Sequence, residues 1–423
     1  MPRRLAVMLA LLVAAGTQAV PVQAAPVALG PTRYVRDVAG FQAAVRALRS
    51  SGGRIVLAAH LYERPMTVGP GRTGYLTITG SRFARVRSLH LDHTTNVSVT
   101  DITIAPINAN AGLHAEYSQH IVLDHLTVTA YRTVRRVSVN LDHSQYVTVR
   151  NTSFAHCGDR NPDWSFCLLP YFASHVVIYD NYFHDCRGCD FIHGRFGPGA
   201  TIRDNRFERA LACPYNWVKC GHQDLIELFT ANGLQVTRNF FGVTQRGGAQ
   251  LYLASASDNV TVTNNVFRGA DPLAPGIRPR VGILVGTRIG TRLPRDVQII
   301  NNTVLSGKLK FGIHAPSSIV LSPRYANVLW VNRPLIANNI LAHQQAPSVT
   351  CNQARKAVHN LIVDGVGCSP TDQVGPALLD RYGRPTAESS LVINQADRGL
   401  APPRDYTYYA RGAHPDIGAH EFR

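Results

Sequence analysis

The sequence predicts an all-β solenoid, a stack of short parallel strands, and three observations lead to this prediction. An asparagine just before an apolar or aromatic pair recurs along the chain, a short β-branched run precedes it each time, and no helical segments alternate with these units. The repeated residues are Asn151, Asn181, Asn205, Asn239, Asn265, Asn302 and Asn339. Their separation runs from 24 residues (181 to 205) to 37 residues (265 to 302), so loops of variable length must join equivalent coils.

Two families of strand alternate within each unit. One family ends at the repeated asparagine, as in Val147–Val149 and Val260–Val262. The other lies between these segments: Val137–Leu141, Phe166–Leu169, Asp190–His193, Asp224–Phe229, Gln250–Leu253 and Gly282–Val285. Each coil should therefore contain at least two sheets. Asparagine tolerates left-handed backbone geometry, so we expect it at the bends, where stacked side chains can bond between coils.

The two ends of the chain differ from the middle. Residues 1–24 resemble a secretory signal, with Arg3 and Arg4, an apolar stretch from Leu5 to Ala15, and small residues before Ala25. Helical spacing of apolar residues from Asp37 to Ser50 predicts a short helix that covers the open end of the solenoid, and a strand follows at Arg54–Ala58. We assign 25–74 to this cap and the first strands, 75–348 to the coils, and 349–423 to a C-terminal flap packed on them.

The chain is strongly basic, with a net charge of +16 that becomes +14 once the two signal arginines are removed. For a secreted protein this charge favours an acidic polysaccharide or a cell-surface glycan as partner, ahead of nucleic acid. No later segment is apolar over the roughly 18 residues that a membrane helix needs. The sequence gives no indication of oligomeric state.

Eight cysteines in an exported chain predict disulfides. Three local pairs would each close one loop: Cys157 with Cys167, Cys213 with Cys220, and Cys351 with Cys368. Cys186 and Cys189 remain open to alternatives, namely a further structural disulfide, a redox pair, or a zinc site completed by Cys213 and Cys220. The oxidising compartment favours structural disulfides.

The capping helix, the asparagine at each bend and the ending Pro415–Phe422 resemble the secreted right-handed parallel β-helix superfamily. Its members include pectate and alginate lyases, polygalacturonase-type hydrolases and alginate epimerases. The segment Gly221–Glu227 is similar to a His-x-Asp-x-Ile-Gln segment of many such proteins, with Glu227 in place of the glutamine. The resemblance implies the fold, while the Asn-Thr-Asp, Gly-His-Gly and Asp-Pro-His-Asp motifs of particular enzyme branches are absent from the sequence.

Two segments of the second strand family share an Asp-x-Ile-polar pattern, at Asp190–His193 and Asp224–Glu227. If they occupy neighbouring coils in register, Asp190 lies beside Asp224 and His193 beside Glu227, about 4.8 Å apart. Alternation with the core residues then turns His193, Glu227 and, from the next strand, Tyr252 outward. Solvated side chains are the alternative interpretation of this outward line.

The Asp190–Asp224 pair supports three interpretations. One pKa rises, as suits a glycoside hydrolase, or the pair holds Ca²⁺ that neutralises a uronate carboxylate for β-elimination, or both side chains simply bond backbone amides at a bend. Candidate acids and bases nearby are Lys219, His222, His193, Arg195 and Tyr252. Trp164, Trp217 and Arg246 are candidate substrate-binding residues.

The charge favours β-elimination, so the sequence predicts a secreted lyase acting on an acidic polysaccharide. A retaining or inverting hydrolase, a uronate epimerase and a non-catalytic glycan-binding protein are the alternatives. Apart from the Ca²⁺ just described, no cofactor is indicated.

Overall fold

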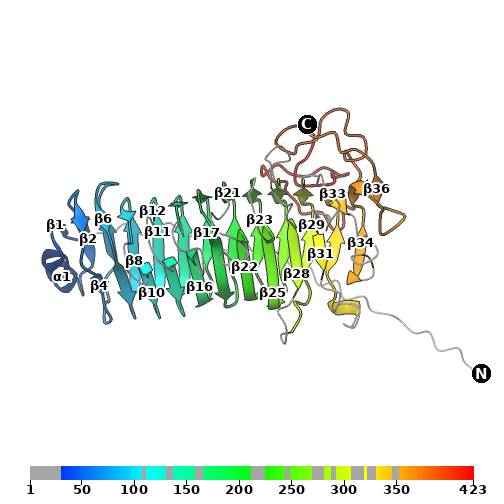
Figure 1. Cartoon of the computed structure of the whole chain (residues 1–423). Helices are drawn as coiled ribbons and strands as arrows, with labels where there is room; N and C mark the ends of the chain where they lie inside the picture. The colour runs from blue at the N-terminus through cyan, green and yellow to red at the C-terminus, as the bar shows by residue number, and fades with distance from the viewer. Residues whose placement is uncertain are drawn as a thin grey trace, which may run out of the picture.

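The structure is a computed structural model that describes residues 30–106, 111–129, 137–157, 165–210, 224–242, 248–268, 281–286, 292–305, 319–321, 330–344, 351 and 353–423. Within these ranges the chain winds into an elongated stack of coils formed by three parallel sheets (Figure 1). The sequence-based prediction of an all-β solenoid is therefore confirmed, and each coil has three sheets where at least two were expected. No helix within these ranges has the length and apolar character needed to cross a bilayer.

The first sheet, called sheet A, has the order β1-β2-β5-β8-β11-β14-β17-β20-β23-β26-β29-β32-β34. Its strands are β1 (Thr32–Val35), β2 (Gly53–Leu57), β5 (Leu76–Thr79), β8 (Thr95–Thr100), β11 (Gln119–Asp124), β14 (Gln145–Arg150), β17 (Val177–Tyr179), β20 (Thr201–Arg203), β23 (Gln235–Thr237), β26 (Thr261–Thr263), β29 (Gln298–Ile300), β32 (Leu335–Ala337) and β34 (Lys356–Val358). These strands are the predicted family that ends at the repeated asparagine.

Sheet B follows sheet A across the asparagine corner. Its strands are β3 (Leu61–Tyr62), β6 (Arg85–Val86), β9 (Thr103–Ile104), β12 (Thr127–Thr129), β15 (Ser153–Ala155), β18 (Tyr182–His184), β21 (Arg206–Glu208), β24 (Phe240–Phe241), β27 (Val266–Phe267), β30 (Thr303–Val304), β33 (Ile340–Gln344), β35 (Leu361–Gly365) and β36 (Gln373–Val374). A short 3₁₀ helix, η2 (Trp330–Asn332), precedes β32.

Sheet C is the second predicted strand family and carries the candidate site. Its strands are β4 (Met66–Val68), β7 (Leu89–Asp92), β10 (Ala111–Glu116), β13 (Val137–Asp142), β16 (Phe166–Ala173), β19 (Asp190–Phe196), β22 (Ile226–Asn232), β25 (Leu251–Asp258), β28 (Ile283–Gly286) and β31 (Ile319–Leu321). Strands of sheets A and B extend from Thr32 to Val374, so the coils run past both bounds of the predicted coil region 75–348. The division into domains stays a prediction.

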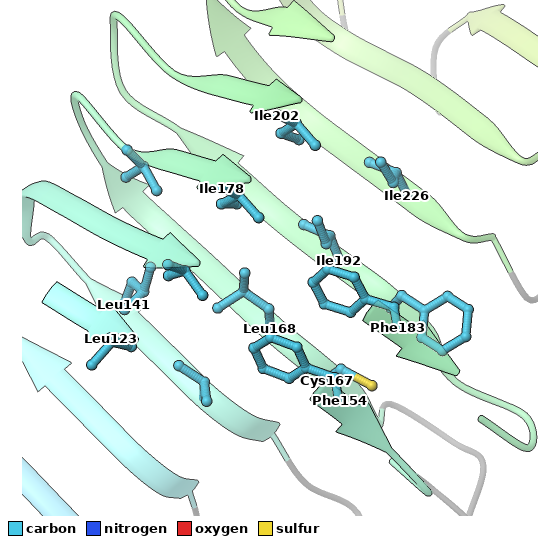
Figure 2. Close-up of a cluster of buried hydrophobic side chains, with 14 of the residues drawn as sticks. Leu123, Leu141, Phe154, Cys167, Leu168, Ile178, Phe183, Ile192, Ile202 and Ile226 are labelled. Atoms are coloured by element: carbon cyan, nitrogen blue, oxygen red, sulfur yellow. The ribbon is translucent and has the colours of Figure 1, made fainter. Parts of the chain in front are cut away.

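Apolar side chains from all three sheets fill the centre of the coil. Figure 2 shows Ile178 and Ile202 of sheet A, Leu168 and Ile192 of sheet C, and Phe183 of sheet B pointing into one continuous core. All five are fully buried. On the sheet B side, Phe183 belongs to a stack whose neighbouring rings are 4.3–5.0 Å apart and nearly parallel. The stack consists of Phe154, Phe183, Phe207, Phe241 and Phe267.

The repeated asparagines form a continuous hydrogen-bonded ladder inside the corner between sheets A and B. Asn239 is representative: its Oδ1 accepts from the backbone N–H and Nδ2 of Asn205, and its own Nδ2 donates to Asn265 Oδ1 and to two backbone carbonyls. The ladder members are Asn181, Asn205, Asn239, Asn265, Asn302, Asn339 and Asn360. At the C-terminal end, Asp372 Oδ1 accepts from the backbone N–H of Asn360 at 2.8 Å.

The predicted left-handed geometry falls one residue earlier than expected. The residues just before the ladder asparagines have φ between 53° and 59°: Asp180, Asp204, Arg238, Asn264, Asn301 and Asn338. Asn151 itself takes this left-handed position, with φ 49°, and Thr152 replaces it in the ladder. The chain turns at the first of the two residues, and the second directs its side chain inward, where the buried backbone groups need partners.

A helix lies at the N-terminal end of the coils, as the apolar spacing predicted. Helix α1 spans Val38–Ala47, and the Asp37 side chain accepts from Gly40 N–H as its N-cap. Phe41 and Ala44 are buried against the first coil. That α1 protects the open end of the solenoid stays a prediction.

The C-terminal segment packs along the outside of the asparagine corner, against one side of the last coils (Figure 1). Asn301 Nδ2 donates to the carbonyls of Asp416 and Gly418, and Asn338 Oδ1 accepts from Asp397 N–H. The left-handed corner residues thus hold the C-terminal segment, while the ladder residues beside them hold the coils together.

Candidate functional site

The predicted register of the site strands is confirmed. Ile192 pairs with Ile226, His193 with Glu227, and Glu227 in turn with Tyr252. The two Asp-x-Ile-polar segments of β19 and β22 therefore lie in neighbouring coils, as their sequence similarity suggested.

The alternative interpretation of this line as solvated side chains is wrong for its first two members. His193 is 8% exposed and Glu227 is 0% exposed, so they are not a solvated surface pair. The reason is local packing: the Phe166 ring stacks on the His193 ring at 4.0 Å, and Phe229 meets it edge-on at 5.0 Å. Alternation along a strand shows which way a side chain points but not what covers it.

Two buried carboxylates contact the Nδ1 atom of His193. Its Nδ1–H donates to Asp190 Oδ2 at 2.8 Å, and Glu227 Oε2 lies 3.1 Å from the same nitrogen. One proton cannot bridge both oxygens with good geometry, so we assign the hydrogen bond to Asp190 and a charge contact to Glu227. The Nδ1 edge is thereby fixed inward, and Nε2 has no hydrogen-bond partner within the described ranges.

These contacts change the proton affinity of the imidazole. Burial by itself would lower the pKa of His193, but the hydrogen bond and the negative charges of Asp190 and Glu227 outweigh burial and raise this pKa to about 9. For Asp190, burial raises the pKa, and its bond to His193 opposes that effect. The cluster therefore favours an imidazolium at neutral pH.

The Asp190–Asp224 pair has the backbone role that the turn interpretation gave it. Asp190 Oδ1 accepts from the backbone N–H of Asp224 at 2.8 Å, and Asp224 Oδ1 accepts from the N–H of Ala249. With Asp190 Oδ2 bonded to His193, this pair does not fit a Ca²⁺ site, which needs six to eight oxygen ligands. Asp190, His193 and Glu227 do place three donor atoms within 4.8 Å of one another, yet an ion there would have to replace the Nδ1 proton.

A groove of about 630 Å³ lies over this part of sheet C, and His193 and Arg195 form part of its lining. The remaining lining residues are Phe166, Leu169, Tyr171, Gly194, Phe229, Thr230, Ser255, Ala256 and Arg292. Because Nδ1 faces the carboxylates, the ring edge available to the groove carries Nε2. Among the described residues that line it there is no carboxylate, and the arginines of the lining are Arg195 and Arg292.

The two arginines of the groove differ in their partners. Arg292 forms a two-pronged ion pair with Asp258, at 2.6 and 3.1 Å. Arg195 is exposed and stands 5.4 Å from the centre of the Phe172 ring. No carboxylate partner of Arg195 occurs in the described part of the chain, so its charge is available to an anionic ligand.

The other sequence candidates divide into two groups. Tyr252 lies one coil beyond Glu227 but outside the groove lining. Lys219, His222, Trp164, Trp217, Arg246, Cys213 and Cys220 lie outside the described residues.

The described cysteines are all paired. Disulfides join Cys157 to Cys167 and Cys351 to Cys368, as predicted from their spacing, and Cys186 to Cys189. The last pairing agrees with structural disulfides and removes both thiolates from the alternative zinc site.

Sequence reasoning missed the apolar walls of the groove, Phe166, Leu169 and Phe229, and also Arg292. Phe166 and Leu169 are in the predicted strand family, so the register could have placed them beside Asp190 and His193. Arg292 carries no such signal because it belongs to neither predicted strand family.

Gly194 allows the chain to bulge directly after His193. Its φ is +154°, and a Cβ atom added there would lie 2.1 Å from the Pro170 carbonyl oxygen. We expect Gly194→Ala to push β19 away from β16 and misplace the imidazole, which would lower the turnover number of the reaction proposed below at least tenfold. Gly233→Ala, at φ +69° but open to space, is the control for backbone strain alone. Equal losses in both variants would contradict a positional role for Gly194.

The likeness to solved structures concerns the fold. The chain resembles an alginate lyase from Paenibacillus sp. str. FPU-7, at 12% identity and a TM-score of 0.44 over 69% of this chain and 95% of that one. It resembles the PL6 family alginate lyase AlyGC at 13% identity and a TM-score of 0.48, over 92% of this chain and 58% of that one. PfbA, a surface adhesin of Streptococcus pneumoniae, is similar at 12% identity and a TM-score of 0.40, over 63% and 81%.

No curated protein matches the sequence. A family model described as the right handed beta helix region matches residues 71–304, which is more than half of the chain. Together with the three parallel sheets, this match shows that the chain belongs to the right-handed β-helix family.

Proposed function

We propose that the protein is a secreted lyase that cleaves an acidic polysaccharide by β-elimination, with His193 as the group that moves the proton. The observation that carries the proposal is the imidazole fixed through Nδ1 by Asp190 while its other edge lines a groove that also holds Arg195. A histidine oriented by a carboxylate is a recurrent arrangement for proton transfer. The net charge, +14 without the two signal arginines, supports an anionic substrate, and the signal-like N-terminus and the disulfides support secretion.

The proposed reaction begins with the proton on the carbon next to the uronate carboxylate. Arg195 binds that carboxylate and neutralises its charge, which makes the carbon acid stronger. Neutral His193 Nε2 takes the proton, the bond from the neighbouring carbon to the glycosidic oxygen breaks, and a carbon–carbon double bond forms. The imidazolium then donates the same proton to the departing oxygen, so that His193 ends neutral.

The raised pKa of His193 suits this role, because a stronger base removes a weakly acidic carbon-bound proton more readily. The same shift predicts the pH dependence. We expect kcat/KM to rise with pH up to about 9 and then to level off, as the fraction of neutral His193 increases. Initial rates measured between pH 6 and 10 would check this. A tenfold change in kcat/KM corresponds to ~1.4 kcal/mol in activation free energy. A maximum near pH 6 would contradict a base with this pKa.

Stability should follow the opposite trend. His193 has a folded-state pKa above its ordinary value of 6.5, so its stabilising contribution is complete below that value and is lost as pH rises toward about 9. Thermal unfolding midpoints recorded across the same pH series separate this effect from catalysis.

A panel of polyuronates tests the reaction class. Ultraviolet absorbance of an unsaturated product supports elimination, whereas reducing ends without that absorbance would identify a hydrolase. Hydrolysis on this fold would need two carboxyl groups at the scissile bond, and the described lining of the groove offers none. Binding without either signal would favour an adhesive role.

A further inference from the structure

Three side chains on the sheet B side of the coils are joined by two hydrogen bonds. Ser153 lies on β15, and His184 ends the neighbouring strand β18. Ser153 Oγ lies 2.9 Å from His184 Nε2, and His184 Nδ1 lies 2.7 Å from Asp185 Oδ2. We call these residues the sheet B triad. None of them is among the described residues that line the groove, so the triad is separate from the site of His193.

The direction of both hydrogen bonds follows from the chemistry of the carboxylate. Burial by itself would raise the pKa of Asp185, but the bond from His184 and the charge of Arg209 outweigh burial and hold this pKa below its ordinary value. An ionised carboxylate only accepts, so the proton of the neutral imidazole is on Nδ1. Nε2 is then an acceptor, and the hydroxyl of Ser153 donates to it. A serine nucleophile and its general base are connected in this order.

The local backbone explains how two adjacent residues can form this arrangement. Asp185 has a φ of 54°, so the chain turns directly after β18 and the carboxylate lies beside the ring of the preceding residue. Arg209, one coil further along, donates to the same carboxylate oxygen. The Tyr182 ring stacks on the His184 ring at 4.1 Å. The base and its carboxylate are therefore both held by neighbours outside the triad.

The serine distinguishes the triad from other histidine–aspartate pairs of the coils. His93 and His143 each bond a neighbouring aspartate at 2.6 Å. In the described part of the chain, no serine hydroxyl bonds either of those rings. The triad is also accessible, because the side chains of His184 and Asp185 are 16% and 19% exposed and Ser153 is partly exposed. A ligand in solution can reach a serine that already has its base in place.

We propose that the sheet B triad is a second catalytic site, which hydrolyses short acyl esters of hydroxyl groups, such as O-acetyl groups carried by a saccharide. Ser153 and His184 are its catalytic residues, and Asp185 is a positioning residue. An ester suits the site because an alkoxide leaves more readily than an amine. A partly exposed serine on the outside of the coils can reach an acyl group that projects from a larger molecule.

The proposed reaction has two halves. His184 Nε2 takes the proton of Ser153 Oγ as this oxygen attacks the ester carbonyl carbon. The bond from that carbon to the ester oxygen breaks, and the imidazolium donates its proton to the departing oxygen, so an alcohol leaves and the acyl group stays on Ser153. A water molecule then attacks the acyl-serine and gives a proton to His184, which returns it to Ser153 Oγ as the carboxylic acid departs.

Hydrolysis of 4-methylumbelliferyl acetate by the full chain, followed by fluorescence, tests the proposal. We expect Ser153→Ala and His184→Ala to lower the protein-dependent rate by roughly 10²- to 10⁴-fold. Thr127→Ala is the matched control, because Thr127 is exposed and pairs with Ser153 from the preceding coil. It removes a hydroxyl group from the same sheet without touching the triad and should keep the wild-type rate.

A covalent probe separates catalysis from structure. A fluorophosphonate should label Ser153 in the wild-type protein, as identified by peptide mass spectrometry. Asp185→Asn should slow this labelling roughly tenfold or more, and Asp185→Glu should restore part of the rate. The proposal is overturned if the wild-type protein hydrolyses the ester no faster than buffer, if Ser153→Ala keeps the wild-type rate, or if the probe does not label Ser153. It is also overturned if the aspartate variants change only the thermal unfolding midpoint.

Discussion

Replacing His193 by alanine is expected to lower kcat by roughly 10²- to 10⁴-fold, the range typical for loss of a positioned acid–base group. KM should change little, because Arg195 and the apolar walls of the groove still bind the substrate. Steady-state kinetics on the best polyuronate would measure both parameters. Circular dichroism and a thermal melt would show that the coils remain folded without the imidazole.

A pair of aspartate variants separates catalysis from structure in the same experiment. Asp190→Asn keeps an acceptor for the Asp224 N–H but removes the charge that binds His193 Nδ1, so the pKa of His193 should fall and the rise of kcat/KM should move to lower pH. Asp224→Asn keeps the acceptor for Ala249 N–H and should leave the profile unchanged. The assignment of His193 fails if the two variants shift the profile equally, or if His193→Ala retains wild-type turnover.

Asn239→Ala is expected to destabilise the fold by about 3–5 kcal/mol, because several buried groups lose their partners at once. Asn239 is fully buried, and its loss leaves the backbone N–H of Asn205 without its acceptor, removes one acceptor of Asn205 Nδ2 and takes one donor from the carbonyl of Ile202. Urea unfolding followed by circular dichroism would give the change in midpoint.

Asn232→Ala is the matched control for that measurement. Asn232 is exposed at the end of β22 and accepts one side-chain bond, from Asn259. It should cost less than about 1 kcal/mol. A similar loss for the two variants would show that the ladder contributes no more than an ordinary surface asparagine.

The fold could be predicted from the sequence because each coil repeats the same arrangement of short strands and a corner residue. β-branched runs and a corner asparagine recur at every turn, and the strands of sheets A and C lie within a few residues of the expected ranges. The exact corner could not be read, since Asp180, Asn264 and similar residues beside the ladder are equally suited to left-handed geometry.

The strand register predicted which residues of the site lie side by side, but it did not predict their surroundings. Two similar segments correctly placed His193 beside Glu227. The burial of His193 depends on Phe166 and Phe229, which cover the imidazole from neighbouring strands, and the pKa of His193 depends on that burial and on the bond to Asp190. Such environments arise from three-dimensional packing, and a strand pattern does not encode them.

The asparagine ladder has a consequence for how this chain can change over time. Each rung is fixed by its own side-chain bonds to the rung before and the rung after, although the intervening segments differ from 24 residues (181 to 205) to 37 residues (265 to 302). A loop can therefore grow, shrink or be exchanged without shifting the strands above and below it. Selection for a new ligand can act on one coil at a time while the asparagine ladder stays the same.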